Sequence, residues 1–168
     1  MKRKHPVVRG HPLHAMVSDI PVALIPLALF AAIAERARPS ASARRTAATA
    51  NAIALGAATT AALVGWWDWL TIPGEHPAKA PATTHGLINT AGLGVSALAI
   101  LVPRRRLELL VALNGSLAVA AWIGGDLVYR LGWRVRPAEE LEQLDAGRSR
   151  KEALAAIEAH EREDTLLS

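Results

Sequence analysis

Residues 11–35 read HPLHAMVSDIPVALIPLALFAAIAE, and this stretch decides the fold class. Positions 20–34 within it carry no charged side chain. Three more uncharged runs follow, at residues 46–67, 80–103 and 109–125. Each run, with its flanks, has about the ~20 residues that a helix needs to cross the ~30 Å hydrocarbon core of a bilayer. The sequence therefore predicts a small protein with four membrane-spanning helices.

Backbone polar groups find no water in the hydrocarbon core, so such spans fold as helices, whose hydrogen bonds stay within the segment. We therefore expect an all-α fold, a four-transmembrane-helix bundle with a short helical soluble C-terminal tail. The transmembrane domain is expected at 1–136, and the tail at 137–168 has a polar, amphipathic pattern split by Gly147. The expected spans are 13–35, 46–70, 84–102 and 107–131.

The chain has a net charge of +4 and contains no cysteine. Its arginines cluster at the ends of the predicted spans, where a membrane protein keeps the charges that face lipid headgroups. This placement argues for the lipid bilayer as a partner and against nucleic acid. The absence of cysteine excludes disulfides, iron–sulfur clusters and covalently attached c-type haem.

Four antiparallel spans put the N-terminus, the loop at 71–83 and the C-terminal tail on one side of the membrane. The loops at 35–45 and 103–106 lie on the other side. We call the first side the histidine end, because it gathers most of the polar and aromatic residues of the spans. Ionisable groups inside spans are costly in lipid and by default indicate function. The histidine end includes His11, His14, Ser18, Asp19, Trp66, Trp67, Asp68, Trp69, His76, His85, Asn89, Trp122, Gly124, Gly125, Asp126 and Tyr129.

Two of the spans carry small or polar residues at steps of three or four, which places them on one helix face. Such stripes predict close helix–helix packing in a membrane. Each stripe also carries an ionisable residue at the histidine end. The stripe of the second span is Asn51, Ala54, Ala58, Ala61, Gly65 and Asp68, and that of the third is His85, Asn89, Gly92 and Ser96.

Histidines on facing helices of a bundle can hold haem b, and glycines let the macrocycle approach the backbone. His14 and His85 lie near the starts of the first and third spans and are the expected axial ligands of the haem iron. His11 is an alternative to His14, because residues i and i+3 share a helix face. The further expected cofactor-binding residues are Asn89, Gly92, Trp66, Gly124, Gly125, Asp126 and Tyr129. Asp19, Asp68, Asp126 and Tyr129 are expected to support the ligands or to handle protons.

Three alternatives to haem stay open at this point. Zinc or copper could be held by the same histidines with Asp19 or Asp126, although the spacing matches no fixed zinc motif. A quinone or proton site could use the histidines and aspartates as proton acceptors. The polar cluster could also organise a structural or small-molecule-binding subunit without a redox centre, and Asp126 could simply pair with Arg130. No nucleophile–base–orienter set is visible, so an electron-transfer protein is expected rather than a stand-alone enzyme.

Three motifs resemble a bacterial four-helix membrane-protein family catalogued as domain of unknown function 2231. They are HPLHAMVSDIPVAL, HGLIN at 85–89 and GGDLVYRLGWRV at 124–135, and the similarity spans about residues 11–135. The family typically opens with His-Pro. Here His11 carries the Pro12 neighbour, whereas His14, the better-aligned histidine, is followed by Ala15. The resemblance therefore leaves both histidines as candidates for the family's first histidine.

The resemblance implies a role in electron transfer at the membrane, because relatives in this family are found joined to cytochrome c-like or Rieske-type domains. It favours haem b over zinc or copper, in a protein of the bacterial cytoplasmic membrane that exchanges electrons with a quinone or a redox partner protein. A homo-oligomer is a further option. Seven arginines lie in the two short loops opposite the histidine end. Because short loops follow the positive-inside rule best, we expect those loops in the cytoplasm and the histidine end outside it.

Overall fold

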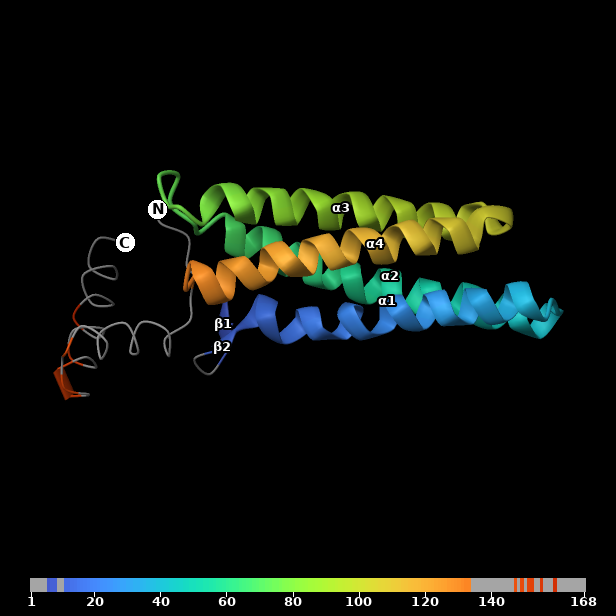
Figure 1. Ribbon diagram of the computed structural model, residues 1–168, viewed down its shortest axis with the longest axis horizontal. Coiled ribbons are helices and arrows are strands. Elements are labelled where there is room, and N and C mark those ends of the chain that lie inside the picture. The colour runs from blue at the N-terminus through green and yellow to red at the C-terminus, as the bar shows by residue number, and fades with distance from the viewer. Residues whose placement is uncertain are drawn as a thin grey trace.

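The computed structural model describes residues 6–8, 11–133, 147, 149, 151, 152, 155 and 159. Four helices make up most of this part of the chain (Figure 1). The predicted tail at 137–168 lies almost entirely outside the described residues, as does His160. The helices are α1 (Leu13–Ala37), α2 (Ala41–Trp69), α3 (Lys79–Leu101) and α4 (Arg106–Gly125), and α4 continues as a π-helical turn at Asp126–Arg130.

Each of the four helices is long and apolar enough to cross a membrane. Large apolar side chains lie on their outer faces, including Phe30, Leu63 and Leu101, which are 65%, 68% and 75% exposed. Apolar surface of this extent is unusual on a soluble monomer, whereas lipid tails solvate it well. The prediction of an all-α four-span bundle is confirmed.

Two helices begin earlier than the sequence predicted. Helix α2 begins at Ala41 rather than at 46, because the Ser40 hydroxyl accepts a hydrogen bond from the Ala43 N–H at 3.0 Å and caps the helix. Helix α3 begins at Lys79 rather than at 84. The predicted spans follow from the uncharged runs alone. A helix can continue past such a run, because its backbone hydrogen bonds also form in the flanking polar sequence. The α1–α2 connection therefore shortens to residues 38–40.

Two short elements were not predicted. Strands β1 (Val7–Val8) and β2 (His11–Pro12) form a minimal antiparallel pair before α1. The Leu13 N–H donates to the Pro6 carbonyl at 2.9 Å. That bond satisfies one of the N–H groups that a helix start leaves without an intrahelical partner. A 3₁₀ turn at Pro103–Arg105 leads into α4.

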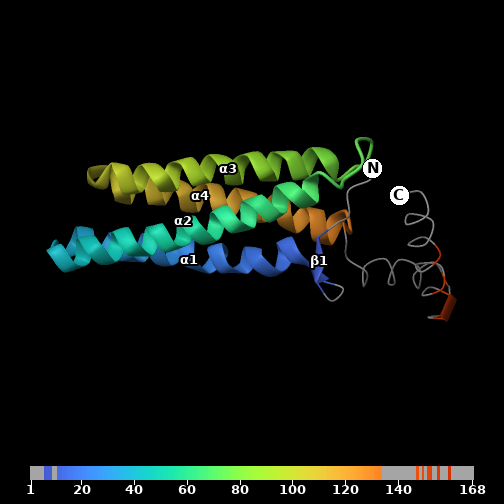
Figure 2. The same ribbon diagram turned by 180° about the vertical axis from the view of Figure 1, so that it is seen from behind.

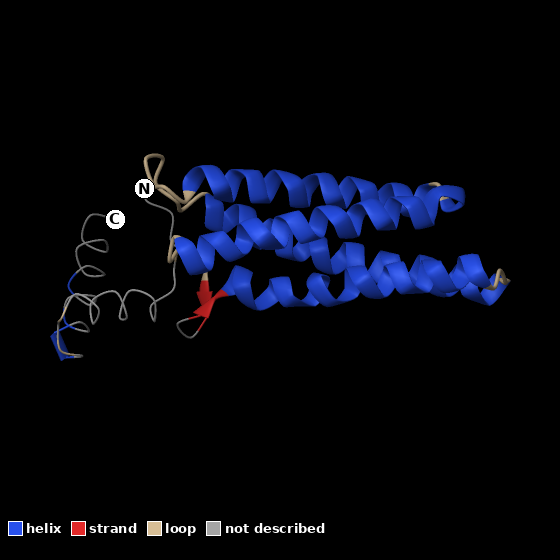
Figure 3. Cartoon of the chain, in the orientation of Figure 1, coloured by secondary structure: helices blue, strands red, loops and turns tan. Residues whose placement is uncertain are grey.

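The helices form two antiparallel hairpins, α1–α2 and α3–α4, that pack side by side with α2 against α3 and α1 against α4 (Figures 1 and 2). The α2–α3 loop, the beginning of α1 and the end of α4 lie at one end of the bundle. The helical and loop regions alternate in the order that this connectivity requires (Figure 3). This connectivity therefore brings the polar and aromatic residues of the four helices together at the histidine end, as expected.

The densest core lies in the half of the bundle away from the histidine end. Asn51 is fully buried there, donates to the Ser96 carbonyl at 2.9 Å and accepts from the Ser96 hydroxyl at 2.8 Å. At the far end, Arg106 is 5% exposed and forms an ion pair with Glu35. These contacts join α2 to α3 and α1 to α4. The apolar core residues are Ile25, Ala28, Ala32, Ala54, Ala99, Leu110 and Leu113.

Candidate functional site

The histidine end of the bundle encloses a cavity of about 660 Å³, lined by residues of all four helices. This volume is within the usual range of small-molecule and cofactor sites, about 300–1,000 Å³. Alanine, glycine and branched apolar residues form most of the wall. The polar residues of the wall are few and lie mainly near the histidine end: His11, His14, Ser18, Asp68, His85 and Asn89, with Ser96 and Ser116 deeper in.

His14 projects from the first turn of α1 onto α2. Its Nδ1 lies 3.2 Å from the Ala61 carbonyl oxygen, and the ring packs on the backbone of Gly65. A Cβ atom at Gly65 would lie 2.8 Å from His14 Cε1, which is too close for any real contact. The stripe of α2 therefore supplies both a hydrogen-bond acceptor and the space that this ring needs, because Ala61 and Gly65 are one turn apart.

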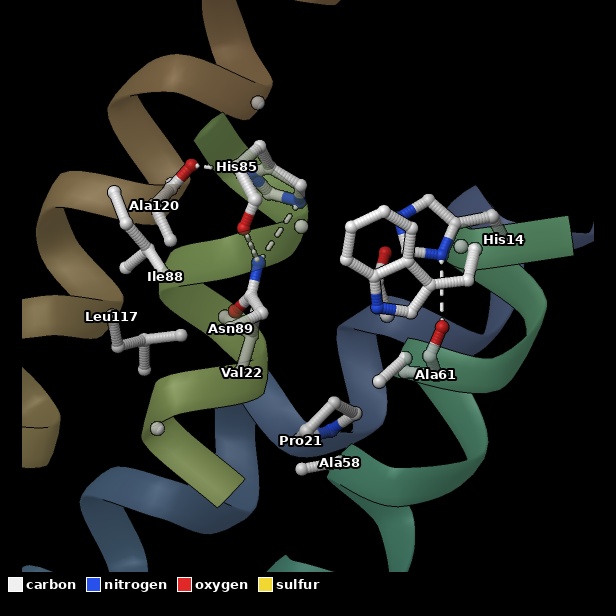
Figure 4. Close-up of a pocket in the computed structure, with 18 of the residues that line it drawn as sticks. His14, Pro21, Val22, Ala58, Ala61, His85, Ile88, Asn89, Leu117 and Ala120 are labelled. Atoms are coloured by element: carbon white, nitrogen blue, oxygen red, sulfur yellow. Dashed lines mark hydrogen bonds between the residues drawn. The ribbon is translucent and has the colours of Figure 1, made fainter. Parts of the chain in front are cut away.

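His85 makes the equivalent contacts between α3 and α4. Its Nδ1 lies 2.9 Å from the Ala120 carbonyl oxygen, and a Cβ atom at Gly124 would lie 3.1 Å from its Cε1. Asn89, one turn further along α3, brings its side-chain Nδ2 to 3.1 Å from His85 Nε2 and donates to the His85 carbonyl at 3.0 Å (Figure 4). The His85 ring is thus held by two hydrogen-bonding groups, the Ala120 carbonyl and the Asn89 side-chain amide.

The two imidazole rings lie opposite each other, with centroids 6.2 Å apart and planes at 80°. A carbonyl oxygen only accepts hydrogen bonds, so in each neutral ring Nδ1 carries the proton and Nε2 carries the lone pair. His14 joins α1 to α2, and His85 joins α3 to α4. The pair therefore depends on the mutual placement of all four helices, and the structure positions His14 opposite His85 while His11 lies exposed in β2 on the cavity wall.

Two tryptophans close the α2–α3 side of the cavity. Trp66 donates from Nε1 to the Thr90 hydroxyl at 3.0 Å, and Trp69 donates to the Thr83 hydroxyl at 2.8 Å. The Trp66 indole lies against Gly86, where a Cβ atom would come within 3.0 Å of it. Trp66 was predicted to form part of the site, but its threonine partner and Gly86 were not. No periodicity in the sequence indicates which threonine an indole will reach.

Several predicted site residues lie outside the cavity wall. Asp126 forms an ion pair with Arg130 at 2.9 Å, as the simpler interpretation of that residue predicted. Tyr129 is 91% exposed on the outer surface. Gly125 and the exposed Asp19 also do not line the cavity. Gly92 does line it and packs on Leu113. The residues that the structure brings together are His11, His14, Trp66, Asp68, His85, Asn89, Gly92 and Gly124.

The loop before α3 and the segment after α4 meet at the histidine end of the bundle, beside the cavity. The ring centroids of His76 and Trp133 are 4.5 Å apart, and the Ala78 N–H donates to His76 Nδ1 at 3.0 Å. Lys79 donates to the Trp69 and Ile72 carbonyls and lies over the Trp69 ring, 3.5 Å from its centroid. These contacts fix the α2–α3 loop, and His76 is not part of the cavity wall.

The protein ligands available for a metal ion are limited. Among the residues that the structure describes, no group of three or more histidine, aspartate or glutamate side chains is close enough together to hold a metal ion. The cavity instead offers two imidazole nitrogens. Such a pair suits a cofactor that brings most of its own metal ligands, as haem does, better than zinc, which takes at least three ligands from the protein.

Comparison with known proteins places the chain in a family. No curated protein and no solved structure matches it. The family model described as predicted membrane protein, domain of unknown function 2231 (DUF2231), matches residues 10–137. The matched region contains α1 to α4, the three histidines of the cavity wall and the motifs that suggested the resemblance. The chain therefore belongs to the DUF2231 family of predicted membrane proteins.

Proposed function

We propose that this protein is a membrane haem b protein that transfers electrons, with His14 and His85 as the axial ligands. One observation carries the proposal. Two imidazoles from the non-adjacent helices α1 and α3 lie opposite each other in an apolar cavity, and each binds a backbone carbonyl through Nδ1. Metal-ligating histidines commonly donate their second N–H to a carbonyl or carboxylate, which fixes the tautomer and the ring orientation.

The distance between the rings agrees with this role. A metal ion lies about 2 Å from each imidazole nitrogen that binds it, and 6.2 Å between the ring centroids leaves space of that order. Gly65 and Gly124 keep the backbone close behind the two rings, so that neither ring can retreat without losing its carbonyl partner. Bound haem would supply a one-electron redox centre in a cavity whose walls are mostly apolar.

Asn89 contacts the His85 nitrogen that the proposal assigns to iron. Its side-chain N–H occupies His85 Nε2, the atom that would bind iron. Ligation therefore requires Asn89 to release Nε2, while its second contact, with the His85 carbonyl, can persist. Within this proposal, Asn89 keeps the imidazole oriented and satisfied until the cofactor arrives.

A second candidate function follows from the same hydrogen bond. Since Asn89 donates to Nε2 and Nδ1 binds Ala120, His85 is fully hydrogen-bonded without a metal. The cavity would then bind a small apolar molecule, with the histidine–asparagine pair as its polar contact. This candidate needs no redox centre.

The absorption spectrum separates the two candidates. Protein purified in mild detergent, or reconstituted with haem, should be red and should show a Soret band that shifts on dithionite reduction. His14→Ala and His85→Ala should each abolish the low-spin spectrum, because each removes one axial ligand. His76→Ala should retain it, since His76 lies outside the cavity wall. A preparation that stays colourless after reconstitution would reject haem, and elemental analysis of the same sample would test for zinc or copper.

A further inference from the structure

We propose that the cavity opens sideways into the bilayer between α1 and α4, and that a lipid-soluble quinone enters through this opening. The quinone would occupy the part of the cavity that extends beyond the histidine pair towards the middle of the bundle. We call this part the deep arm; it is lined by Pro21, Val22, Ile25, Gly92, Ser96, Leu113, Ser116 and Leu117. The redox role of the quinone and its contact with Asn89 rest on the proposed function, whereas occupation of the deep arm through the lateral opening does not.

The length of the cavity is the first argument. Its α1 wall runs from His14 to Ile25, and its α3 wall runs from His85 to Ser96. Each stretch covers eleven residue steps, which corresponds to about 16 Å along a helix axis. A compact ligand at the histidine pair leaves the deep arm empty, whereas a ligand with a long apolar tail fills it.

The position of the opening is the second argument. Val22 on α1 and Ala121 on α4 both line the cavity and are both exposed on the outside of the bundle, Val22 by 48%. Ala15, two turns before Val22 on the same edge of α1, shares both properties. In the α2 and α3 walls, every lining residue is buried or half-buried. The wall is therefore open where α1 faces α4.

The side-chain bonds between neighbouring helices also differ between the α2–α3 contact and the α1–α4 contact, which we call the two seams. On the α2–α3 seam, Trp66 and Trp69 bind threonines and Asn51 binds Ser96. On the α1–α4 seam, the described residues form one side-chain bond, the Arg106–Glu35 ion pair at the opposite end of the bundle. Helix α1 also contains Pro21 and Pro26. Each lacks the N–H of an intrahelical hydrogen bond, which makes a helix easier to bend at that point. The α1–α4 seam is the side that can widen.

The chemistry of the deep arm indicates the class of ligand. Its walls are mostly apolar, and the Ser96 and Ser116 hydroxyls, which donate to Asn51 and Leu113, keep lone pairs to accept from a quinol hydroxyl. Asn89 lies between the histidine pair and the deep arm. If His85 Nε2 held iron, the Asn89 N–H that contacts it in this structure would become available to a quinone carbonyl. A polar ring with an apolar tail, delivered from the lipid phase, fits these groups.

The test titrates a decyl-tailed benzoquinone into the whole protein in lipid nanodiscs. Binding is measured by the quenching of tryptophan fluorescence, because Trp66 lines the cavity. Ala121→Phe and Val22→Phe should fill the opening and lower the affinity about tenfold or more, a change of ~1.4 kcal/mol. Ala118→Phe is the matched control: Ala118 is exposed on α4, one turn away, and does not line the cavity. The control should stay within about twofold of the unmodified protein.

The outcomes separate the opening from the haem proposal. Equal affinity in Ala121→Phe, Val22→Phe and the unmodified protein would overturn the lateral site, whatever the absorption spectrum shows. Weaker binding in both seam variants and not in Ala118→Phe supports it, even if the protein proves to hold no haem. Weaker binding in all three variants would mean that any bulky residue on the outer surface perturbs the protein, and would also overturn the assignment. Size-exclusion profiles confirm that each variant is folded.

Discussion

Two glycines determine where the histidine rings lie. Gly65 and Gly124 each leave the space that an imidazole edge occupies, at 2.8 and 3.1 Å from where a Cβ would be. Each ring is also bonded to a carbonyl one turn before its glycine, at Ala61 or Ala120. A methyl group at either position would push the ring away from that carbonyl, so the site depends on residues that carry no side-chain chemistry of their own.

We therefore expect Gly124→Ala to displace His85 and to weaken haem retention by about tenfold or more, as measured by haem transfer to apomyoglobin. Gly115→Ala on the same helix is the control, because nothing lies within 4 Å of a Cβ there. Gly65→Ala and Gly56→Ala form the corresponding pair on α2. Equal haem loss in Gly124→Ala and Gly115→Ala would show that the close contact is unimportant.

A substitution of Asn89 should affect haem binding and quinone binding in opposite directions. If the protein holds haem as proposed, the Asn89 bond to His85 Nε2 would compete with iron, so Asn89→Ala should raise haem affinity by up to about fivefold, the equivalent of one hydrogen bond of ~1 kcal/mol. The same substitution should weaken quinone binding, because it removes the donor next to the deep arm. Spectral titration of the apoprotein with haem measures the first effect. A large fall in haem affinity would contradict the competition between Asn89 and iron.

At the scale of elements, the bundle is asymmetric. Helices α2 and α3 are joined by two indole–hydroxyl bonds and by the buried Asn51–Ser96 pair. Helices α1 and α4 are joined at the end away from the histidines, through Glu35 and Arg106. Lipid tails are as apolar as the helix surfaces, so packing and polar bonds decide which helices stay together. The histidine end therefore has one fixed side and one side that can open.

A double-mutant cycle on Trp66→Phe and Thr90→Val should measure the strength of the fixed side. Hydrogen bonds between membrane helices average about 0.6 kcal/mol of coupling and reach about 1.7 kcal/mol, so we expect a coupling energy within that range. Unfolding in mixed detergent micelles gives the values. Thr60→Val is the control, since the Thr60 hydroxyl binds a carbonyl of its own helix at Gly56. A coupling energy of zero would mean that the indole bond does not hold α2 to α3.

At the scale of the whole molecule, the arginine cluster and the histidine-lined cavity lie at opposite ends of the bundle. The two turns opposite the histidine end and the helix ends beside them carry seven arginines, and one of them, Arg106, is buried in its ion pair with Glu35. The remaining six are exposed. They form a basic end that suits contact with anionic headgroups of the cytoplasmic leaflet. The cavity lies at the other end, and from the positive-inside rule we expect that end on the outer face.

This orientation can be tested with reporters fused after Ser168. We expect alkaline phosphatase activity and no green fluorescent protein fluorescence in bacterial cells, because the end of α4 lies at the histidine end of the bundle. Replacing Arg104 and Arg105 by Gln weakens the positive bias and should shift part of the population towards the opposite orientation. Strong fluorescence from the unmodified fusion would place the histidine end in the cytoplasm.

The sequence by itself determined the number of spans, their antiparallel order and the identity of the polar end. These features follow from the position of apolar runs along the chain and from the alternation of sides that each crossing imposes. The stripe with Ala61 and Gly65 also marked the face of α2 that meets another helix. Sequence position alone was sufficient because each of these properties belongs to one segment or to the order of segments.

Only the tertiary structure decided which side chains meet. Each residue turns a helix by about 100°, so three residues of the motif GGDLVY face different surroundings. Gly124 lies under His85, Asp126 pairs with Arg130 and Tyr129 faces outwards. The rotation of a helix about its own axis depends on its packing against helices that are distant in the sequence. The sequence left His11 and His14 as alternatives on one helix face, but His11 lies in β2 before α1 begins, and packing on Gly65 sets His14 opposite His85.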